Sequence, residues 1–314
     1  MVITMKCIFI YNPKSGKGKV FKNIEFIKKE LSKKYDIVDI YETKSQEDTI
    51  SKAKESCDIY DSIIFAGGDG TFNDITCGIA ECKKRPILGY LPTGTVNDIA
   101  RNLKISKNIK KAIKNIIDGQ YANHDVGIIN GRYFIYVAAV GTFAATSFRT
   151  KHKFKKVFGK FAYALDGLQE LLNPSIINVK VTTKEGETFE NATPLLLVMN
   201  SISAGGEPFN KNGHMNDGKF DIVIVKKFMG RGLISIANMA IIGIRRKRLT
   251  KYYQVLRSEE FKIEVDRDIT WALDGEEGIK GSAEIKNLHS HIQIYVPHKK
   301  NGPKSKYLKN KKQV

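Results

Sequence analysis

The chain has 314 residues, of which 42% are hydrophobic, and it carries 52 lysines and arginines against 33 aspartates and glutamates. This length exceeds that of a typical single domain, so two domains are expected, and the hydrophobic share is ordinary for a globular protein. The longest apolar run, residues 233–244, is shorter than the roughly 20 residues of a membrane span, and the N-terminal residues lack a secretory pattern. We therefore expect a cytoplasmic protein.

The surplus of basic residues gives a formal net charge of +19. Such a surface attracts polyanions, which include nucleic acids, anionic membranes and nucleotides. Part of the surplus is local, because residues 299–314 contain seven lysines and no acidic residue, and residues 245–248 read RRKR. These clusters either keep the chain soluble or contact anionic lipid, where each basic residue near the surface contributes about 1 kcal/mol.

The four cysteines show no recognisable metal-binding or redox spacing. No pair has the CxxC pattern, and the chain does not resemble a small secreted domain. We therefore expect free, reduced thiols in or near the core at Cys7, Cys57, Cys77 and Cys82.

Strand and helix patterns alternate along the first third of the chain. The expected strands are 6–11, 37–41, 62–66 and 87–90, and the expected helices are 19–34, 47–57, 72–82, 97–103 and 107–117. Such alternation predicts a parallel sheet that is covered by helices on both faces. In a sheet of this kind the ligand lies beyond the carboxyl ends of the strands.

From about residue 125 the pattern changes to strand-like runs that turn residues separate. The expected strands are 133–139, 176–183, 194–199, 220–225, 252–256, 261–265 and 291–296, with helical patterns at 155–172 and 232–244. This predicts an α/β protein with a doubly wound, mainly parallel N-terminal domain at 1–125 and a β-rich sandwich domain at 126–297. The basic tail, 298–314, is either disordered or a terminal element that returns to the first domain.

Three glycine-rich turns follow predicted strands of the first domain, and each leads into a predicted helix. They are residues 11–18 (YNPKSGKG), 65–74 (FAGGDGTFND) and 91–98 (LPTGTVND). Glycine lets backbone N–H groups approach an anion closely, and a helix N-terminus adds a favourable partial charge. One such junction is usually only a turn, but three at one sheet edge predict a polyphosphate site, with hydroxyl donors at Ser15, Thr71 and Thr95.

The second turn carries Asp69, which is an unexpected residue in an anion site. A carboxylate would repel phosphate unless a cation lay between them, and Mg²⁺ is the simplest such cation. Asp98 and Asp125 also follow turns or strands that could face the same cleft, although each also suits a helix cap or a turn. The sequence contains neither the GxxxxGK[ST] phosphate loop nor the GxGxxG dinucleotide fingerprint.

Five pieces of the sequence together resemble the catalytic domain of the diacylglycerol kinase family, especially its soluble bacterial lipid kinases, with sphingosine and ceramide kinases as eukaryotic relatives. They are Asn12–Gly16 (NPKSG), Gly67–Asp74 (GGDGTFND), Pro92–Asp98 (PTGTVND), His214–Gly218 (HMNDG) and Leu273–Glu276 (LDGE). The GGDGT piece is shared with NAD kinases and phosphofructokinases, whereas its combination with the late Asp-Gly-Glu is more specific. At Asp74 the family usually carries glutamate.

The resemblance implies a kinase that transfers the γ-phosphate of ATP to a lipid hydroxyl, with diacylglycerol as the default substrate and phosphatidic acid as the product. Asp69 and Asp125 would belong to the carboxylate network around the catalytic metal. A second, structural Mg²⁺ would be bound by Asp217 and the backbone carbonyls of His214 and Lys219. The ATP site would comprise Asn12, Pro13, Lys14, Ser15, Gly16, Thr43, Gly67, Gly68, Asp69, Gly70, Thr71, Phe72, Asn73, Asp74 and Thr95.

Glu276 would be the general base in a protein of this family. A lipid hydroxyl has a high pKa, so a base must take its proton as the new P–O bond forms. Gly275 permits a sharp turn that could aim the Glu276 carboxylate into a cleft. From the residues alone, however, Asp274 and Glu276 are equally typical of an ordinary hairpin turn, and so is the Asp217-Gly218 pair.

The expected partners are ATP and a lipid at an anionic membrane surface, with the protein associated peripherally. Nucleic-acid binding is not expected, because the basic tail has no interleaved aromatic residues. A homodimer is compatible with an exposed edge of the β-rich domain. Two other functions stay open: a kinase of a soluble alcohol such as NAD, and a non-catalytic module that binds nucleotide or membrane.

Overall fold

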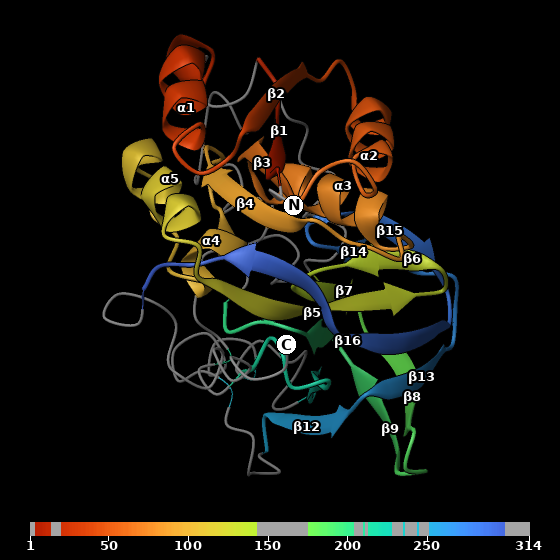
Figure 1. The fold of residues 1–314 in the computed structure, drawn as a ribbon. Coiled ribbons are helices and arrows are strands. Elements are labelled where there is room, and N and C mark those ends of the chain that lie inside the picture. The colour runs from red at the N-terminus through yellow and green to blue at the C-terminus, as the bar shows by residue number, and fades with distance from the viewer. Residues whose placement is uncertain are drawn as a thin grey trace. The chain divides into compact units, whose positions relative to one another are not determined.

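The computed structural model describes residues 4–13, 20–142, 175–203, 210, 213–227, 235, 244 and 251–298. Its contacts divide the chain into two units (Figure 1). The first unit comprises residues up to Asp125 together with the chain from Ser290 onward, and the second comprises Val126–His289. The sequence pattern had assigned residues 290–297 to the second domain instead. The helical patterns at 155–172 and 232–244 lie wholly or mainly outside the described residues, as do residues 299–314 of the basic tail.

A parallel sheet forms the centre of the first unit. Its strands lie in the order β2-β1-β3-β4, and the end of β16 lies parallel to β4, with Ile294 opposite Leu88. All six residues of β3 are buried, as expected of a central strand that is covered on both faces. The strands are β1 (Lys6–Tyr11), β2 (Ile37–Glu42), β3 (Ser62–Gly67), β4 (Ile87–Pro92) and β16 (Ala283–Tyr295).

Helices cover both faces of this sheet, as the alternating pattern predicts. Figure 1 shows α1 and α5 on one face and α2 and α3 on the other. Side chains cap two of these helices: Ser45 accepts a hydrogen bond from the Asp48 N–H, and Asn108 accepts one from the Lys111 N–H. The helices are α1 (Ile24–Leu31), α2 (Gln46–Glu55), α3 (Asp69–Ile79), α4 (Asp98–Asn102) and α5 (Ile109–Ile117), with a short 3₁₀ helix at Phe21–Asn23.

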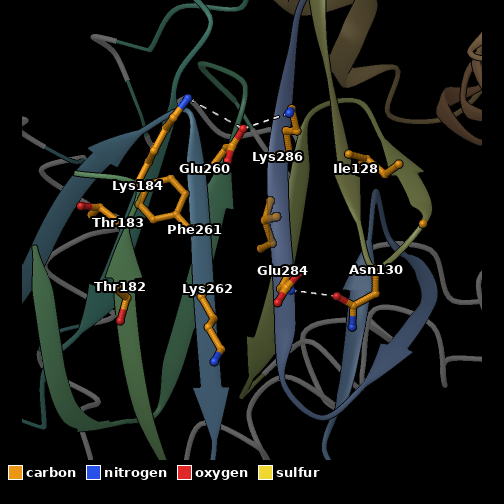
Figure 2. A pocket seen from close by; sticks show the side chains of 12 residues that line it. Ile128, Asn130, Thr182, Thr183, Lys184, Glu260, Phe261, Lys262, Glu284 and Lys286 are labelled. Atoms are coloured by element: carbon orange, nitrogen blue, oxygen red, sulfur yellow. Dashed lines mark hydrogen bonds and ion pairs between the residues drawn. The ribbon is translucent and has the colours of Figure 1, made fainter. Parts of the chain in front are cut away.

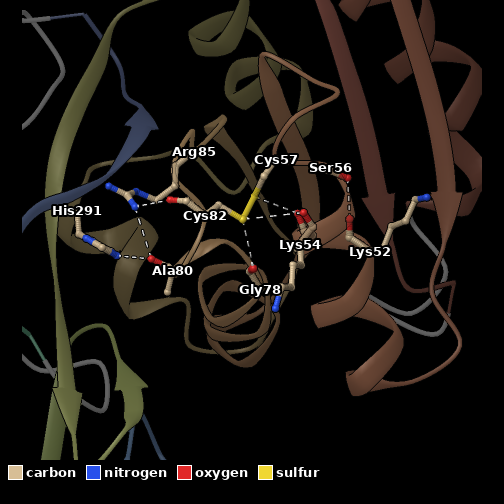
Figure 3. The surroundings of a disulfide bond; sticks show 10 residues. Lys52, Lys54, Ser56, Cys57, Gly78, Ala80, Cys82, Arg85 and His291 are labelled. Atoms are coloured by element: carbon tan, nitrogen blue, oxygen red, sulfur yellow. Dashed lines mark hydrogen bonds between the residues drawn. A yellow bond between two sulfur atoms is a disulfide. The ribbon is translucent and has the colours of Figure 1, made fainter.

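A disulfide joins Cys57 to Cys82, so the expectation of free thiols at these two positions is wrong (Figure 3). Cys57 lies just beyond the end of α2, and Cys82 lies just beyond the end of α3. Because α2 and α3 pack side by side, the two Cα atoms come within 6.4 Å, which is a normal separation for a disulfide. Cys7 and Cys77 are free thiols, as expected.

Two sheets enclose the core of the second unit. In one, β13 pairs in antiparallel fashion with β8 and with the first part of β16, and β9 is the outer strand. The other is antiparallel, in the order β12-β11-β10-β7-β14-β15. The strands are β8 (Ile177–Thr183), β9 (Thr188–Thr193), β13 (Glu260–Val265), β12 (Tyr253–Ser258), β11 (Phe220–Val225), β10 (Leu195–Met199), β7 (Val137–Gly141), β14 (Thr270–Leu273) and β15 (Glu276–Lys280).

The inward-facing side chains of the two sheets form one apolar cluster, so the predicted sandwich is confirmed. Trp271 is fully buried there, and the rings of Phe134 and Phe220 stack with centroids 5.5 Å apart. A hairpin of β5 (Tyr121–Ile129) and β6 (Arg132–Phe134) adds to the edge of β16. No described helix is long and apolar enough to cross a membrane.

The predicted strand at 133–139 is two strands in the structure, because β6 ends at Phe134 and β7 begins at Val137. The interruption has a physical cause: the N–H groups of Ile135 and Tyr136 donate to the carboxylate of Asp274 instead of to a neighbouring strand. Sequence patterning could not anticipate a partner so distant along the chain.

Candidate functional site

The described turn residues leave the same edge of the parallel sheet of the first unit. β1 lies between β2 and β3, and β4 follows β3, all in parallel. The segments that begin at Asn12, Thr43, Gly68 and Thr93 therefore emerge side by side. Lys14, Ser15 and Gly16 of the first turn lie outside the described residues.

The second and third glycine turns are joined backbone to backbone. The N–H groups of Thr93 and Gly94 both donate to the carbonyl of Gly67, at 2.8 and 3.2 Å. A Cβ atom on Gly94 would lie 2.5 Å from the Cα of Gly68, so these chains can approach only as glycines. A Cβ on Gly67 would overlap the side chain of Thr71. The two turns thus form one compact element.

Asn97 holds the third turn in shape, a role that the sequence analysis did not assign. Its backbone is left-handed, with φ of 56°, and its side chain is fully buried. The side-chain carbonyl accepts hydrogen bonds from the Gly94 N–H and the Tyr90 hydroxyl, both at 3.0 Å, and the amide donates to the Gly94 carbonyl at 2.7 Å. Asparagine tolerates this backbone region better than most residues, which is the signal that sequence inspection could have used.

Asp69 connects the second turn to the helix that follows the third. It begins α3, and its Oδ1 accepts a hydrogen bond from the Ile99 N–H, in the first turn of α4, at 3.2 Å. Burial raises the pKa of the Asp69 carboxyl, and hydrogen bonds from backbone N–H groups oppose that rise. The N–H groups at the start of α4 therefore offset part of the cost of burying the Asp69 carboxylate. Whether a cation also lies between Asp69 and a phosphate stays a prediction.

The remaining predicted nucleotide residues of the first unit divide into two groups. Thr43 is buried, and both its N–H and its hydroxyl donate to the carbonyl of Tyr11, at 2.9 and 3.4 Å, which ties the end of β2 to the first turn. The ring of Phe72 packs edge-on against those of Phe65 and Tyr90, which stack on each other, so it belongs to the core. More exposed are Thr95 and Asp74, whose carboxylate accepts a hydrogen bond from Gln46 of α2.

Asp125, the third predicted catalytic acid, is fully buried. Its Oδ1 accepts a hydrogen bond from the Ser290 N–H at 2.6 Å, and Ser290 has a left-handed backbone with φ of 51°. Asp69 and Asp125 therefore each have a separate backbone partner, on α4 and on β16. Their membership of one metal-centred network stays a prediction.

Glu276 is exposed at the start of β15, immediately after a tight hairpin turn. Leu273 and Glu276 pair across the hairpin, so Asp274 and Gly275 form the two-residue loop, with φ of 51° and 88°. Two left-handed residues in succession are typical of a type I′ turn. The turn that the sequence predicts is therefore present, and it leaves the Glu276 carboxylate accessible to solvent.

Comparisons with known proteins identify the family. Residues 6–129 match the model of the diacylglycerol kinase catalytic domain. A diacylglycerol kinase of Staphylococcus saprophyticus is 33% identical over 290 residues, which cover 92% of this chain and 94% of that protein. One of Staphylococcus carnosus is 34% identical over 291 residues, with the same coverage. The chain belongs to the diacylglycerol kinase family. It is therefore a lipid kinase, and the non-catalytic alternative is set aside.

Solved structures agree with this assignment to the diacylglycerol kinase family. The crystal structure of a diacylglycerol kinase from Bacillus anthracis has a TM-score of 0.77 at 26% identity, and the match covers 95% of this chain and 99% of that one. A second structure from the same organism has a TM-score of 0.81 at 28% identity. The likeness extends over both units, so the predicted two-part α/β fold is confirmed.

The predicted structural metal site of this family member lies in the second unit, at the turn before β11. Oδ1 of Asp217 accepts a hydrogen bond from the Lys219 N–H at 3.2 Å, whereas Oδ2 pairs with the Arg257 guanidinium and lies 3.3 Å from Nδ1 of His214. A carboxylate beside turn carbonyls suits the oxygen preference of Mg²⁺, so the residues fit this ion. Arg257 would compete with it for Asp217. The described residues contain no cluster of three or more His, Cys, Asp or Glu side chains that could hold a metal.

A separate cavity of about 440 Å³ lies on the second unit of this kinase, against β13 and β16 (Figure 2). Its lining mixes apolar side chains, such as Phe261, with charged ones: Glu260 forms ion pairs with Lys286 at 3.0 Å and with Lys184 at 4.0 Å. None of the predicted site residues lines it.

Proposed function

We propose that this family member transfers the γ-phosphate of ATP to the hydroxyl group of diacylglycerol at an anionic membrane surface. The observation that carries the proposal is the joined pair of glycine turns at the carboxyl edge of the parallel sheet. Phosphoryl transfer asks the protein mainly to position the reactants and to neutralise charge, and this edge offers backbone N–H groups and the N-termini of α3 and α4.

In the proposed mechanism the Gly67–Asp74 and Thr93–Asn97 turns bind the phosphate oxygens and hold the terminal phosphate in line with the acceptor. Glu276 accepts the hydroxyl proton as the acceptor oxygen forms its new bond to the γ-phosphorus. The bond from that phosphorus to the β,γ-bridging oxygen breaks, and ADP leaves with the bonding electrons. Bound Mg²⁺ would neutralise part of the phosphate charge, with Asp69 and Asp125 in its carboxylate environment. Asp217 and the carbonyls of His214 and Lys219 would hold the structural ion.

Peripheral membrane association rests on charge. Within the first unit, α5 carries exposed lysines at positions 110, 111 and 114, and the whole chain has a net charge of +19. Attraction to an anionic leaflet is screened by salt. Sedimentation with phosphatidylglycerol vesicles should therefore fall steeply between 50 and 500 mM salt, whereas phosphatidylcholine vesicles should capture little protein at any salt concentration.

The deciding experiment compares acceptors under identical conditions. Labelled ATP is supplied with diacylglycerol in mixed micelles, with a total lipid extract, or with NAD in buffer, and the products are identified by mass spectrometry. We expect labelled phosphatidic acid from diacylglycerol and no phosphorylated NAD. Phosphorylation of NAD but of no lipid would contradict the proposed lipid substrate. A different labelled lipid from the extract would replace diacylglycerol as the substrate.

A further inference from the structure

We propose that Asp274 is the positioning residue for Glu276: its buried carboxylate anchors the hairpin turn to the segment between β6 and β7 and so sets the direction of the Glu276 side chain. This inference rests on the proposed role of Glu276 as the base. All of the residues involved belong to the second unit, and all of them lie within the described part of the chain.

The Asp274 carboxylate accepts three backbone hydrogen bonds from one short segment. Oδ2 accepts from the Ile135 N–H at 2.6 Å, and Oδ1 accepts from the N–H groups of Tyr136 and Val137 at 2.9 and 3.0 Å. The backbone of Asp274 takes part as well, because its N–H donates to the Val137 carbonyl at 2.8 Å and its carbonyl accepts from the Tyr136 hydroxyl at 3.0 Å. Both carboxylate oxygens, the N–H and the carbonyl of Asp274 thus each bond to this one segment.

The anchoring segment is itself held from another strand. Asn200, which follows β10 and is fully buried, donates from its side-chain amide to the Ile135 carbonyl at 2.9 Å. Its N–H donates to the Tyr136 carbonyl at 3.0 Å. The hairpin turn is therefore fastened to a segment that is fixed in the sheet, and not to a free loop.

Asp274 differs from an ordinary turn aspartate in its burial and in its hydrogen-bond partners. The left-handed conformation of the first loop residue suits Asn or Asp before Gly, and that preference alone explains the residue type at many hairpins. Such a side chain is normally exposed, whereas that of Asp274 is 6% exposed and bonded to another part of the sheet. A buried carboxylate that accepts three N–H bonds is satisfied, and without it three backbone donors would be left buried and unpaired.

The anchor acts on Glu276 because only Gly275 separates the two residues. Gly275 has φ of 88°, and a Cβ placed on it would meet nothing within 4 Å, so Gly275 itself adds no packing contact on that side of the turn. The hydrogen bonds of Asp274, together with the pairing of Leu273 and Glu276 across the hairpin, therefore set the direction of the chain as it enters β15. A base that is displaced by about 1 Å from its acceptor can cost about a hundredfold in rate.

The test begins with Glu276→Gln, which must abolish turnover if Glu276 is the base. Asp274→Asn keeps one acceptor oxygen but turns an NH₂ group toward backbone donors. We expect its kcat to fall by about tenfold to a hundredfold, with the KM for ATP within about twofold of the wild-type value. Tyr136→Phe removes the hydroxyl bond to the Asp274 carbonyl, and we expect a smaller fall in kcat with a melting temperature lower by no more than a few degrees.

A glycine pair separates positioning from general destabilisation. Gly275 and Gly186 have nearly equal φ values of 88° and 86°, and a Cβ on either meets nothing within 4 Å. Gly275→Ala and Gly186→Ala should therefore lower the melting temperature similarly, whereas only Gly275→Ala should lower kcat. Wild-type turnover in Glu276→Gln would overturn the proposed role of Glu276 as the base, and the positioning role of Asp274 with it. An inactive Glu276→Gln combined with wild-type kcat in both Gly275→Ala and Tyr136→Phe would overturn the positioning role alone, even if Asp274→Asn failed to fold.

Discussion

Oδ1 of Asp69 accepts a hydrogen bond from the backbone N–H of Ile99, and this contact links the second glycine turn to the helix that follows the third. The same carboxylate is predicted from the sequence to lie beside a Mg²⁺ ion. Asp69 thus has a structural partner before any ligand binds, and its structural and chemical roles can be separated by substitution.

Asp69→Asn should remove activity without loss of stability. Burial raises the folded-state pKa of Asp69 above its unfolded-state value. Ionisation of this carboxyl therefore lowers the free energy of unfolding, and this loss grows as pH rises through the folded-state pKa. Asparagine keeps an acceptor oxygen for the Ile99 N–H and carries no charge. We expect kinase activity to fall by about a hundredfold or more. The melting temperature of the variant, relative to wild type, should be higher at pH 7 than at pH 4.

If thermal unfolding instead shows Asp69→Asn to be less stable at every pH, the carboxylate is needed for the fold. Its loss of activity would then carry no information about chemistry.

Gly94→Ala should specifically disrupt the joined second and third glycine turns, which we propose bind ATP. The new Cβ would lie 2.5 Å from the Cα of Gly68, and neither backbone can move without shifting a turn. Overpacking of this kind costs about 1–3 kcal/mol, and we expect affinity for ATP to fall by at least about tenfold. Isothermal titration calorimetry with ATP measures this affinity. Gly68→Ala, whose Cβ would lie 3.3 Å from the Cα of Gly94, should have a milder effect in the same titration.

Gly78→Ala provides the control for Gly94→Ala. Its Cβ would lie 2.4 Å from the carbonyl oxygen of Ile50, where α3 packs on α2. It should lower the melting temperature while ATP affinity stays near the wild-type value. Equal losses of ATP affinity in both variants would show that any steric clash in the first unit weakens ATP binding.

Removing the guanidinium of Arg257 should strengthen Mg²⁺ binding at Asp217. Arg257 neutralises that carboxylate, and a divalent cation must compete with it. In thermal unfolding with 10 mM MgCl₂, we expect Arg257→Gln to gain at least about 2 °C more than wild type, since about 1 kcal/mol shifts a protein of this size by a few degrees. Asp217→Asn should gain nothing from Mg²⁺. If Asp217→Asn gains as much as wild type, the ion binds elsewhere.

Reduction of the Cys57–Cys82 disulfide should destabilise the protein. The two residues are 25 positions apart, and closing a loop of that size contributes about 3 kcal/mol to the free energy of unfolding in the chain-entropy model. Urea unfolding with and without dithiothreitol measures this difference. Cys57→Ser should match the reduced wild type and show no further response to the reductant; a continued response would point to another bond.

The Cys7 thiol should be unreactive in the folded protein. Burial raises its pKa to about 12, so almost none of it is thiolate at pH 8. A thiol-reactive dye applied without reductant should label Cys77 first and reach Cys7 only when urea unfolds the chain. Labelling of Cys7 at the rate of Cys77 under native conditions would contradict the buried position on β1.

Much of the fold could be predicted from local patterns. β1 and β11 have the predicted bounds, and the glycine turns lie after the predicted strands. Among the strands that were missed, β9 (TFENAT) and β15 (EEGIK) are short and polar, and alternation over so few residues is typical of turns as well. The longer strand β5 (YANHDVGII) was missed too. Helix α3 begins earlier than predicted, since its first turn contains Asp69 and Gly70, which are typical of loops.

The sequence by itself determined the order of strands and helices, the chemistry of the turns and the family, because each of these depends on residues that are neighbours in the chain. Only the tertiary structure decided which distant groups meet. Asp274 accepts a hydrogen bond from the N–H of Ile135, Asp69 accepts one from the first turn of α4, and Cys57 forms a disulfide with Cys82. Hydrogen bonds and disulfides depend on separations of a few ångströms in space, and periodicity along a chain carries no information about those separations.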